Sequence, residues 1–356
     1  MKILKLIKKI PSLLMINFRK GVCNIRVKVF LFSILALSFI SCIKDTRDAN
    51  SSDKDAVSGK KSKFVAIANG SSKGAYSADG VNWSPSTMPY EADWIDVCYG
   101  NGRFVAVVRD SDRAAYSDDG INWNTTKMSR PSKWLSVAYG NGKFAAITLN
   151  SNKAAYSYDG IKWIDTTLPD SAPWVRVCYG KDKFIVLSCE SSKAAYSEDG
   201  IKWKAASTLP NEAYCYVVTY GKDKFVAAIY YSGKGAYSTD GIKWTETLLS
   251  KKDWMLEHWA DVCYGNGRFV AIACTRNIAA YSDNGIKWEA ATLPGNEPWL
   301  RVCYGNGKFA AIAGIFYIEE ETLGSNKAAY SEDGINWKET TMPSVASWIN
   351  ICYGGD

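Results

Sequence analysis

The stretch Tyr76-Ser77-Ala78-Asp79-Gly80-Val81-Asn82-Trp83 decides the fold of this chain, because close copies of it follow six more times. The copies end, at intervals of 40 to 49 residues, at Trp83, Trp123, Trp163, Trp203, Trp244, Trp288 and Trp337. A period of this length in 356 residues indicates one repeated unit rather than two or three unrelated domains.

One copy of the unit, residues 94–123, shows the expected local structure. Residues 94–99, 103–108 and 113–117 read as strands, and a fourth begins at Ile121. Gly100-Asn101-Gly102 follows the first strand and Asp119-Gly120 the third, which is typical of hairpins, and a short polar loop follows the second. Four antiparallel strands in about 40 residues, without a helical pattern, predict one blade of a β-propeller.

The two ends of the repeat region predict how the ring closes. The first repeat starts at its second strand, Lys63–Ile67, and the chain finishes with an isolated first strand, Trp348–Tyr353. In a ring, the C-terminal strand completes the N-terminal blade and removes an open edge. We therefore expect an all-β fold over residues 63–356, a seven-bladed propeller of four-stranded antiparallel blades closed in this way.

Four residues of each copy are expected to stabilise the fold. The Ser and Asp side chains can bond to backbone groups of the turn, the Gly permits positive φ, and the Trp covers the hairpin. The structural motif residues are Ser77, Asp79, Gly80, Trp83, Ser117, Asp119, Gly120, Trp123, Ser157, Asp159, Gly160, Trp163, Ser197, Asp199, Gly200, Trp203, Ser238, Asp240, Gly241, Trp244, Ser282, Asn284, Gly285, Trp288, Ser331, Asp333, Gly334 and Trp337.

The pattern Ser-x-Asp-Gly-x-x-Trp resembles the Asp-box, or BNR, repeat of sialidase-type propellers across residues 63–353. The usual box has one more residue between Asp and Gly, so a shorter turn is expected here. The resemblance implies a propeller and a structural box that lies away from the catalytic face. The arginine triad, the Tyr–Glu pair and the acid–base Asp of sialidases have no residue-by-residue match, and those propellers typically have six blades.

The N-terminal residues 1–41 read as a signal peptide. Eight Lys or Arg and no acid accompany an apolar run, Val29–Ile40, that is too short to span a bilayer. The run leads into Ser41-Cys42, which resembles a bacterial lipoprotein signal with Cys42 as the lipidated residue. A short uncleaved anchor and ordinary secretion are the alternatives, and Met15 is an alternative start to Met1.

Residues 42–62 are predicted to be the lipidated cysteine and a flexible tether, which would span about 25 Å. We expect localisation in the bacterial cell envelope, lipid-anchored to a membrane. Outside residues 1–41 the chain has 35 basic and 36 acidic residues, so the overall charge of +7 belongs to the leader and is no evidence for a nucleic-acid partner.

Cysteine and histidine give no sign of a metal or catalytic centre. Cys98 and four counterparts share one first-strand position that Ala138 and Thr219 also occupy, which predicts small buried side chains rather than disulfides. No Cys-x-x-Cys pair occurs. We predict no metal, no cofactor and no catalytic residue.

A ligand site is expected where the repeats differ. The connectors between blades and the loops after the second strands should share one face, and both insertions fall there, in blades five to seven. Exposed aromatic residues beside acids suit glycan or protein recognition. The candidate ligand-binding residues are Tyr230, Tyr231, Trp254, His258, Phe316, Tyr317, Glu319, Glu320 and Glu321.

A second variable set lies in the middle of the first strands, which should line the central channel. The charged or polar candidates are Asp96, Arg176, Asp261, Arg301 and Asn350. They would bind a small ligand or water, or form ion pairs between blades, such as Asp261 with Arg301.

Together these features predict a membrane-tethered, non-enzymatic propeller that recognises glycan or protein partners through the loop face of blades five to seven. We expect it to be monomeric. A sialidase-like glycoside hydrolase using the glutamates of 319–321 is one alternative. A purely structural scaffold of the envelope is the other.

Overall fold

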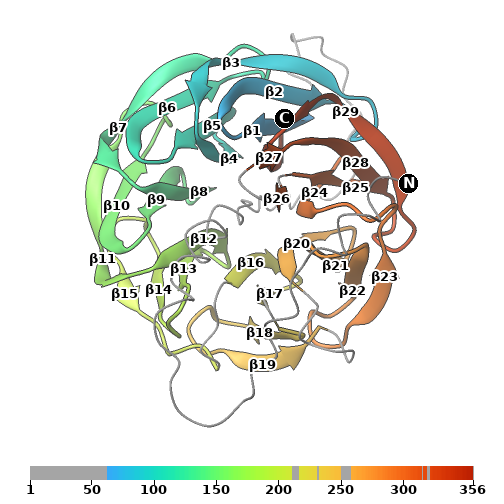
Figure 1. Ribbon diagram of the computed structural model, residues 1–356. Coiled ribbons are helices and arrows are strands. Elements are labelled where there is room, and N and C mark those ends of the chain that lie inside the picture. The colour runs from blue at the N-terminus through green and yellow to red at the C-terminus, as the bar shows by residue number, and fades with distance from the viewer. Residues whose placement is uncertain are drawn as a thin grey trace, which may run out of the picture. The chain divides into compact units, whose positions relative to one another are not determined.

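The computed structural model describes residues 62–210, 216–230, 232–249, 258–314, 316–318 and 321–355, with only the backbone of 216, 316–318 and 321–323. No helix occurs in these ranges, so none there is long and apolar enough to cross a membrane. Seven four-stranded antiparallel sheets stand around a common centre, which confirms the predicted seven-bladed propeller (Figure 1).

Four blades have a long outer strand of nine residues. From the channel outward, their strands are β30 (Trp348–Gly354), β1 (Lys63–Ala68), β2 (Ser71–Ser77) and β3 (Ser84–Ala92) in blade 1; β4 (Trp94–Gly100), β5 (Arg103–Val108), β6 (Ser111–Ser117) and β7 (Asn124–Ser132) in blade 2; β8 (Trp134–Gly140), β9 (Lys143–Thr148), β10 (Ser151–Ser157) and β11 (Ile164–Ala172) in blade 3; and β24 (Trp299–Gly305), β25 (Lys308–Ala313), β28 (Ser325–Ser331) and β29 (Lys338–Ala346) in blade 7.

The other three blades have an outer strand of two to four residues. Their strands are β12 (Trp174–Gly180), β13 (Lys183–Ser188), β14 (Ala194–Ser197) and β15 (Lys204–Ala205) in blade 4; β16 (Tyr216–Gly221), β17 (Lys224–Ile229), β18 (Lys234–Ser238) and β19 (Thr245–Leu248) in blade 5; and β20 (Trp259–Gly265), β21 (Arg268–Ala273), β22 (Ile278–Ser282) and β23 (Glu289–Thr292) in blade 6. A separate hairpin, β26 (Phe316–Ile318) with β27 (Glu321–Leu323), is inserted in blade 7.

Ring closure is carried by the C-terminal strand. β30 pairs antiparallel with β1, with Lys63 opposite Gly354 and Ile67 opposite Asn350. The anchor of this strand is Trp348, whose side chain is fully buried. The closure that the orphaned ends of the repeat predicted is therefore present.

Each inner strand ends in a Tyr-Gly pair that packs against the neighbouring blade. A Cβ atom added to Gly140 would lie 2.0 Å from Cγ of Tyr179, and all seven equivalent glycines meet the next tyrosine at 1.9–2.1 Å. The contact between Gly354 and Tyr99 crosses the closure. Only glycine leaves room for these rings, so the Tyr-Gly pairs set the spacing between blades.

The repeated motif builds the turn between the third and fourth strands. In blade 1, Ser77 Oγ donates to Asp79 Oδ1 at 3.0 Å and accepts the N–H of Gly80 at 2.9 Å. Burial opposes ionisation of Asp79, but hydrogen bonds from Asn82 and Val81 outweigh it and lower the pKa of the carboxyl to about 2. Gly80 has φ of 72°, which explains why glycine ends the turn.

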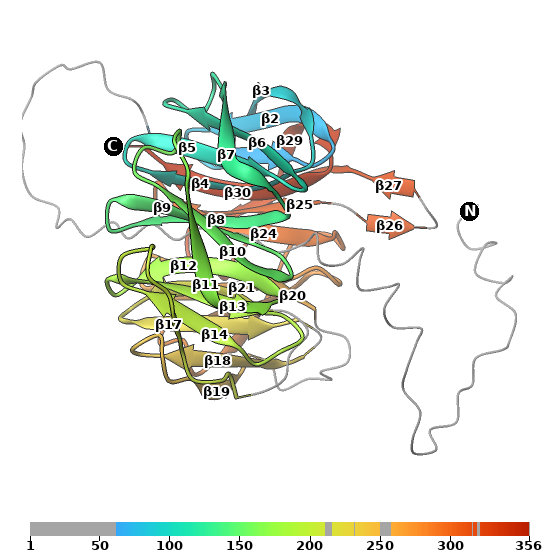
Figure 2. The same cartoon turned by 90° about the vertical axis from the view of Figure 1, so that its left-hand side faces the viewer.

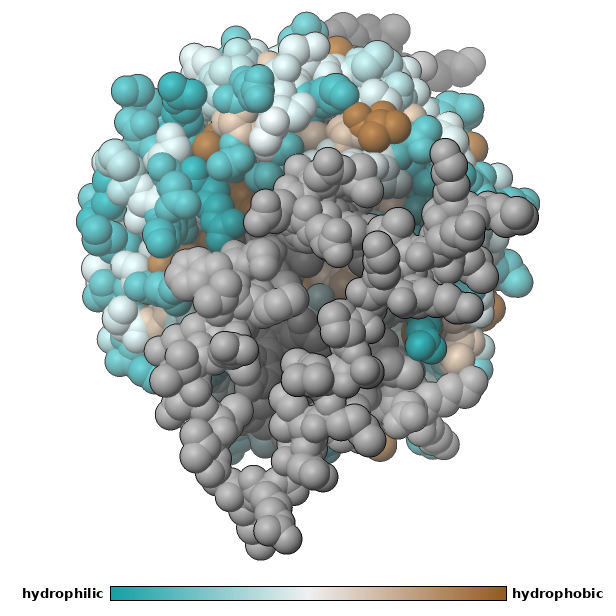
Figure 3. Space-filling model, in the orientation of Figure 1, coloured by the Kyte–Doolittle hydropathy of each residue, from teal (hydrophilic) through white to brown (hydrophobic). Residues whose placement is uncertain are grey.

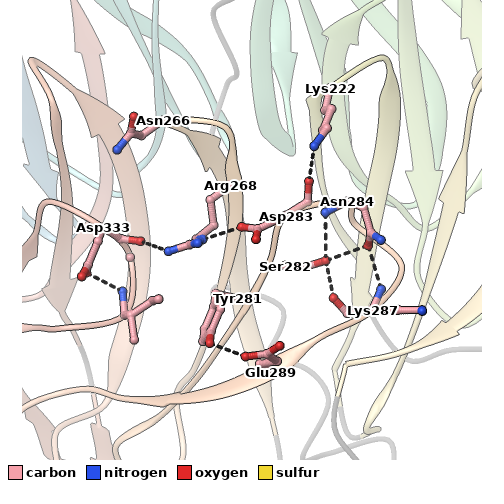
Figure 4. A network of polar contacts seen from close by, with 12 residues as sticks. Lys222, Asn266, Arg268, Tyr281, Ser282, Asp283, Asn284, Lys287, Glu289 and Asp333 are labelled. Carbon is pink, nitrogen blue, oxygen red and sulfur yellow. Dashed lines mark hydrogen bonds and ion pairs between the residues drawn. The ribbon is translucent and has the colours of Figure 1, made fainter.

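The sixth copy, with Asn284 in place of Asp, keeps the same turn. Asn284 Oδ1 accepts the N–H groups of Ile286 and Lys287 at 2.8 and 2.9 Å, as the carboxylates do elsewhere (Figure 4). An amide oxygen is an adequate acceptor here, so the substitution does not alter the blade.

The variable residue of the motif has a role that its side chain does not reveal. Its backbone carbonyl accepts a hydrogen bond from the preceding blade, as in Lys222 Nζ to Asp283 O at 2.8 Å and Asn266 Nδ2 to Glu332 O at 3.3 Å. Figure 4 shows Arg268 between Asp283 of its own blade and the carbonyl of Asp333 in the next blade. Because a main-chain group accepts the bond from the preceding blade, this contact does not depend on the residue type, which is Ala, Asp, Tyr, Glu or Thr in the seven copies.

Candidate functional site

Seven side chains occupy the middle of the inner strands, around the channel: Asp96, Ser136, Arg176, Val217, Asp261, Arg301 and Asn350. Each is at most 3% exposed. All five of the polar channel residues that the sequence singled out are therefore buried against other groups rather than open to solvent.

The two carboxylates of this set connect neighbouring inner strands. Asp96 accepts the N–H of Val97 at 2.9 Å and that of Val137, in the next blade, at 2.8 Å. Asn350 Nδ2 donates to the same carboxylate from the closing strand. Asp261 likewise accepts an N–H of its own strand and, at 2.9 Å, the N–H of Val302 in blade 7.

The charges of this set balance across the channel. Arg176 Nη2 lies 4.0 Å from Asp261 Oδ1, so the pair joins blades 4 and 6 past the uncharged Val217 of blade 5. Burial lowers the pKa of Arg301 to about 9, against the attraction of Asp261. Burial raises the pKa of Asp96 and of Asp261 to about 6, although the two arginines oppose that shift.

The channel carboxylates are expected to make the propeller less stable as pH rises from 4 to about 6.5. A raised pKa means that the folded state holds the proton more tightly than the unfolded chain, whose Asp pKa is about 3.9. The stabilisation is thus complete below pH 4 and lost as pH passes 6, by up to about 3 kcal/mol for each group. Urea unfolding at a series of pH values measures it, and Asp96→Asn should flatten the profile.

Asp79→Asn is the matched control for that measurement. The motif carboxylates have lowered pKa values, so their contribution is complete above pH 4 and is lost only as pH falls toward 2. His258, whose pKa is lowered by burial, acts in the opposite direction near pH 6 but is present in every variant. A profile of Asp96→Asn as steep as that of the wild type would contradict the assignment.

The face that carries the blade connectors and the loops after the second strands is called the connector face, and the opposite one the turn face. Two predicted ligand residues meet on the connector face: the rings of Tyr230 and His258 lie with their centroids 5.0 Å apart. Tyr230 Oη is 3.4 Å from Cys274 Sγ, and the N–H of Cys274 donates to His258 O at 2.9 Å. Both rings are half-buried.

The residues beneath this aromatic pair were not found by sequence reasoning. Ala260, Cys274 and Leu300 form a small buried cluster against which Tyr230 packs. The only sequence signal was that Cys274 and Cys189 share a position in their blades. Burial lowers the pKa of His258, so a neutral imidazole beside a tyrosine forms an amphipathic surface at neutral pH.

The other predicted ligand residues are placed only in part. Phe316 and Tyr317 lie in β26 and Glu321 begins β27, so the inserted loop contains a hairpin. Tyr231, Trp254, Glu319 and Glu320 lie outside the described residues, as do Cys42 and the rest of residues 1–61.

Cysteines and acids of the described residues form no reactive cluster. Seven cysteines there are free and buried, and burial raises the pKa of Cys98 well above its usual range. No group of three His, Cys, Asp or Glu side chains in these ranges is arranged to hold a metal ion.

Comparison with known proteins finds similarity of fold. No family model and no curated protein matches the chain. Among solved structures, virginiamycin B lyase from Staphylococcus aureus has a TM-score of 0.59 at 13% identity, covering 70% of this chain and 84% of its own. A streptogramin B lyase has 0.61 at 11%, covering 72% and 92%. YCF48 bound to D1 peptide has 0.52 at 14%, covering 79% and 95%.

Proposed function

We propose that this protein is a membrane-tethered, non-enzymatic binding propeller of the bacterial cell envelope, which recognises a glycan or protein through the connector face of blades 5 to 7. The Asp-box-like turns hold its blades, and Cys42 carries the lipid. The observation that supports the binding face is that both insertions and the Tyr230–His258 pair fall in one sector.

That sector carries two features that the other described blades lack, beside the short outer strands that blades 5 and 6 share with blade 4. The hairpin β26–β27 stands outside the seven blades on the connector face (Figure 2). The Tyr230–His258 pair lies where blades 5 and 6 adjoin. Scaffold function alone would not require such differences between blades.

The character of the connector face favours a few anchoring groups over a broad apolar contact. Figure 3 views this face, and the described residues that remain visible around its rim are mainly hydrophilic, with apolar ones scattered among them. A half-buried aromatic pair on such a surface is the usual form of a recognition hot spot.

Burial excludes the two channel aspartates as the catalytic pair of a glycoside hydrolase. Asp96 and Asp261 each accept two backbone N–H groups and are at most 1% exposed. Hydrolysis of a glycoside needs two carboxyl groups that flank a bound sugar. Groups enclosed by strand backbones serve the structure instead.

Detergent-solubilised full-length protein is expected to retain its partner in a glycan array or an envelope pull-down through the aromatic pair. Tyr230→Ala with His258→Ala, or deletion of residues 315–325, should reduce retention at least tenfold, since hot-spot aromatics dominate binding energy. Tyr158→Ala is the control, because Tyr158 is 55% exposed on the turn face.

Three outcomes would overturn the proposal. Retention that is unchanged in both connector-face variants would remove the site. Turnover of a panel of fluorogenic glycosides would make the protein an enzyme. Mass spectrometry of the same preparation that finds no lipid on Cys42 would remove the tether.

A further inference from the structure

The long outer strands complete the junctions between regular blades. Each of these outer strands contains a bulge, and beyond the bulge its last residue pairs with the first residue of the third strand, as Ala92 does with Ser71. The following inner strand begins with a buried Trp, whose indole N–H donates to the carbonyl four residues earlier. This bond is 3.3 Å for Trp94, 3.1 Å for Trp134, 3.0 Å for Trp174 and 3.2 Å for Trp348.

The junction of blades 6 and 7 has the same chain length but another path. Thr292 and Trp299 are seven residues apart, as are Thr87 and Trp94. In blade 6, however, the pairing of the outer strand ends with Ile278 opposite Thr292 and one further hydrogen bond, from Leu293 N–H to Asn277 O at 2.9 Å; among the described strands, Arg276 has no partner of the kind that Ser71 has in Ala92. The junction is therefore rearranged rather than shortened.

Two residues with left-handed backbone explain the rearrangement. Gly295 has φ of 65° at the position four before Trp299, where the regular junctions have Tyr90, Arg130, Asp170 and Ser344. Arg276 also has φ of 65°, at the place where Ser71 pairs in blade 1. Neither conformation continues a strand. The outer edge of blade 6 thus lacks half a strand.

The missing half strand leaves a donor without an acceptor. Trp299 is 0% exposed, and its indole N–H has no hydrogen-bond partner; Trp259, at the junction of blades 5 and 6, shares this feature. The seven motif tryptophans also lack an indole partner, but they do so in every blade alike. Only the inner-strand tryptophans distinguish the irregular sector from the regular blades.

We propose that an extended segment of a protein partner docks at the outer edge of blade 6, between Arg276–Ile278 and Leu293–Trp299. Its main chain takes the place that the second half of the outer strand has in regular blades, and one of its carbonyls accepts the indole N–H of Trp299. Unpaired strand edges recruit extended peptides in this way. The inference rests on the proposed binding function and narrows the partner class to polypeptide.

Charge at the edge specifies the partner further. The other blades place Lys or Arg where blade 6 has Ile278, and two of these pair with an acid of their own outer strand, Lys234 with Glu246 and Lys327 with Glu339. Ile278 packs instead on the apolar cluster around Trp259. Arg276 is exposed, and none of the ion pairs among the described residues includes it. The partner segment accordingly carries an apolar residue beside a carboxylate.

The test uses random twelve-residue peptides displayed on phage and selected on detergent-solubilised full-length protein. Selected peptides should alternate apolar residues, include Asp or Glu, and protect the amides of 276–279 from hydrogen exchange. Gly295→Ser, which places the residue of the blade 7–1 junction in this one, should weaken binding at least tenfold. Asp170→Gly, the reverse change in a regular junction, is the matched control and should leave binding intact.

A second variant keeps the test decisive if Gly295→Ser perturbs folding. Trp299→Phe removes the indole donor and retains an aromatic ring, so peptide binding should fall about tenfold while thermal unfolding stays cooperative. Partner retention that depends on residues 315–325 but not on Gly295, Trp299 or Arg276 would overturn this inference and leave the proposed function standing. Absence of any peptide, glycan or envelope partner would overturn both.

Discussion

Deleting residues 348–356 is expected to abolish the cooperative unfolding transition of the whole propeller. The deletion removes the inner strand of blade 1 with Trp348, Ile349 and Ile351, all fully buried, and every hydrogen bond between β30 and β1. Each such side chain contributes about 1.5–3 kcal/mol by burial, and domains are stable by only about 5–15 kcal/mol in total. Differential scanning calorimetry and near-ultraviolet circular dichroism measure the loss.

The truncation also opens the ring at two further points. It removes the Asn350–Asp96 hydrogen bond and the packing of Gly354 against Tyr99. A deletion of residues 315–323 is the control, because β26 and β27 pair only with each other among the described strands. A synthetic peptide of residues 346–356 should restore the transition in trans. A truncated chain that melts like the full-length protein would refute closure by β30.

Gly140→Ala is expected to destabilise the propeller by about 3 kcal/mol. The new methyl group would lie 2.0 Å from Cγ of Tyr179, and insertion of an atom into a packed contact costs about 1–3 kcal/mol or more. The tyrosine belongs to the next blade, so the clash separates two sheets rather than bending one turn. Guanidinium unfolding monitored by tryptophan fluorescence measures the change.

Gly142→Ala, in the same hairpin, separates this packing effect from backbone strain. Gly142 has φ of 73° with nothing within 4 Å of an added Cβ, so only the conformational cost of about 1–2 kcal/mol applies. In the double variant with Tyr179→Ala, the effect of Gly140→Ala should shrink, since the clashing ring is gone. Equal losses for the two alanine variants would show that the Tyr-Gly contact does not set the blade spacing.

Much of the architecture is readable from the sequence because each blade is a local unit. The spacing from Trp83 to Trp123 contains two hairpins, and the orphaned strand at Trp348 has only one possible place in a ring. The motif turn is equally local, since Ser77 and Asp79 bond within five residues.

Contacts between blades are the part that sequence reasoning missed. Gly140 meets a tyrosine 39 residues later, and Arg176 reaches Asp261 past a whole blade, in addition to the attraction between Asp261 and its expected partner Arg301. Lys222 donates to the backbone carbonyl of Asp283, and a contact with a backbone carbonyl leaves no residue pattern in the sequence. The Tyr230–His258 pair was found because insertions on one face fall in one sector, whereas Gly295 looked like an ordinary loop glycine.

The closing strand also has a mechanical consequence. Because β30 pairs with one side of β1 and β2 with the other, β1 is an interior strand of its sheet rather than an edge strand, and it follows directly on the residues proposed as the tether. Tension on a membrane anchor would enter at Lys63 and load both hydrogen-bond ladders of β1 at once. A strand that is paired on both sides should resist being pulled out of its sheet better than an edge strand, which is held on one side alone.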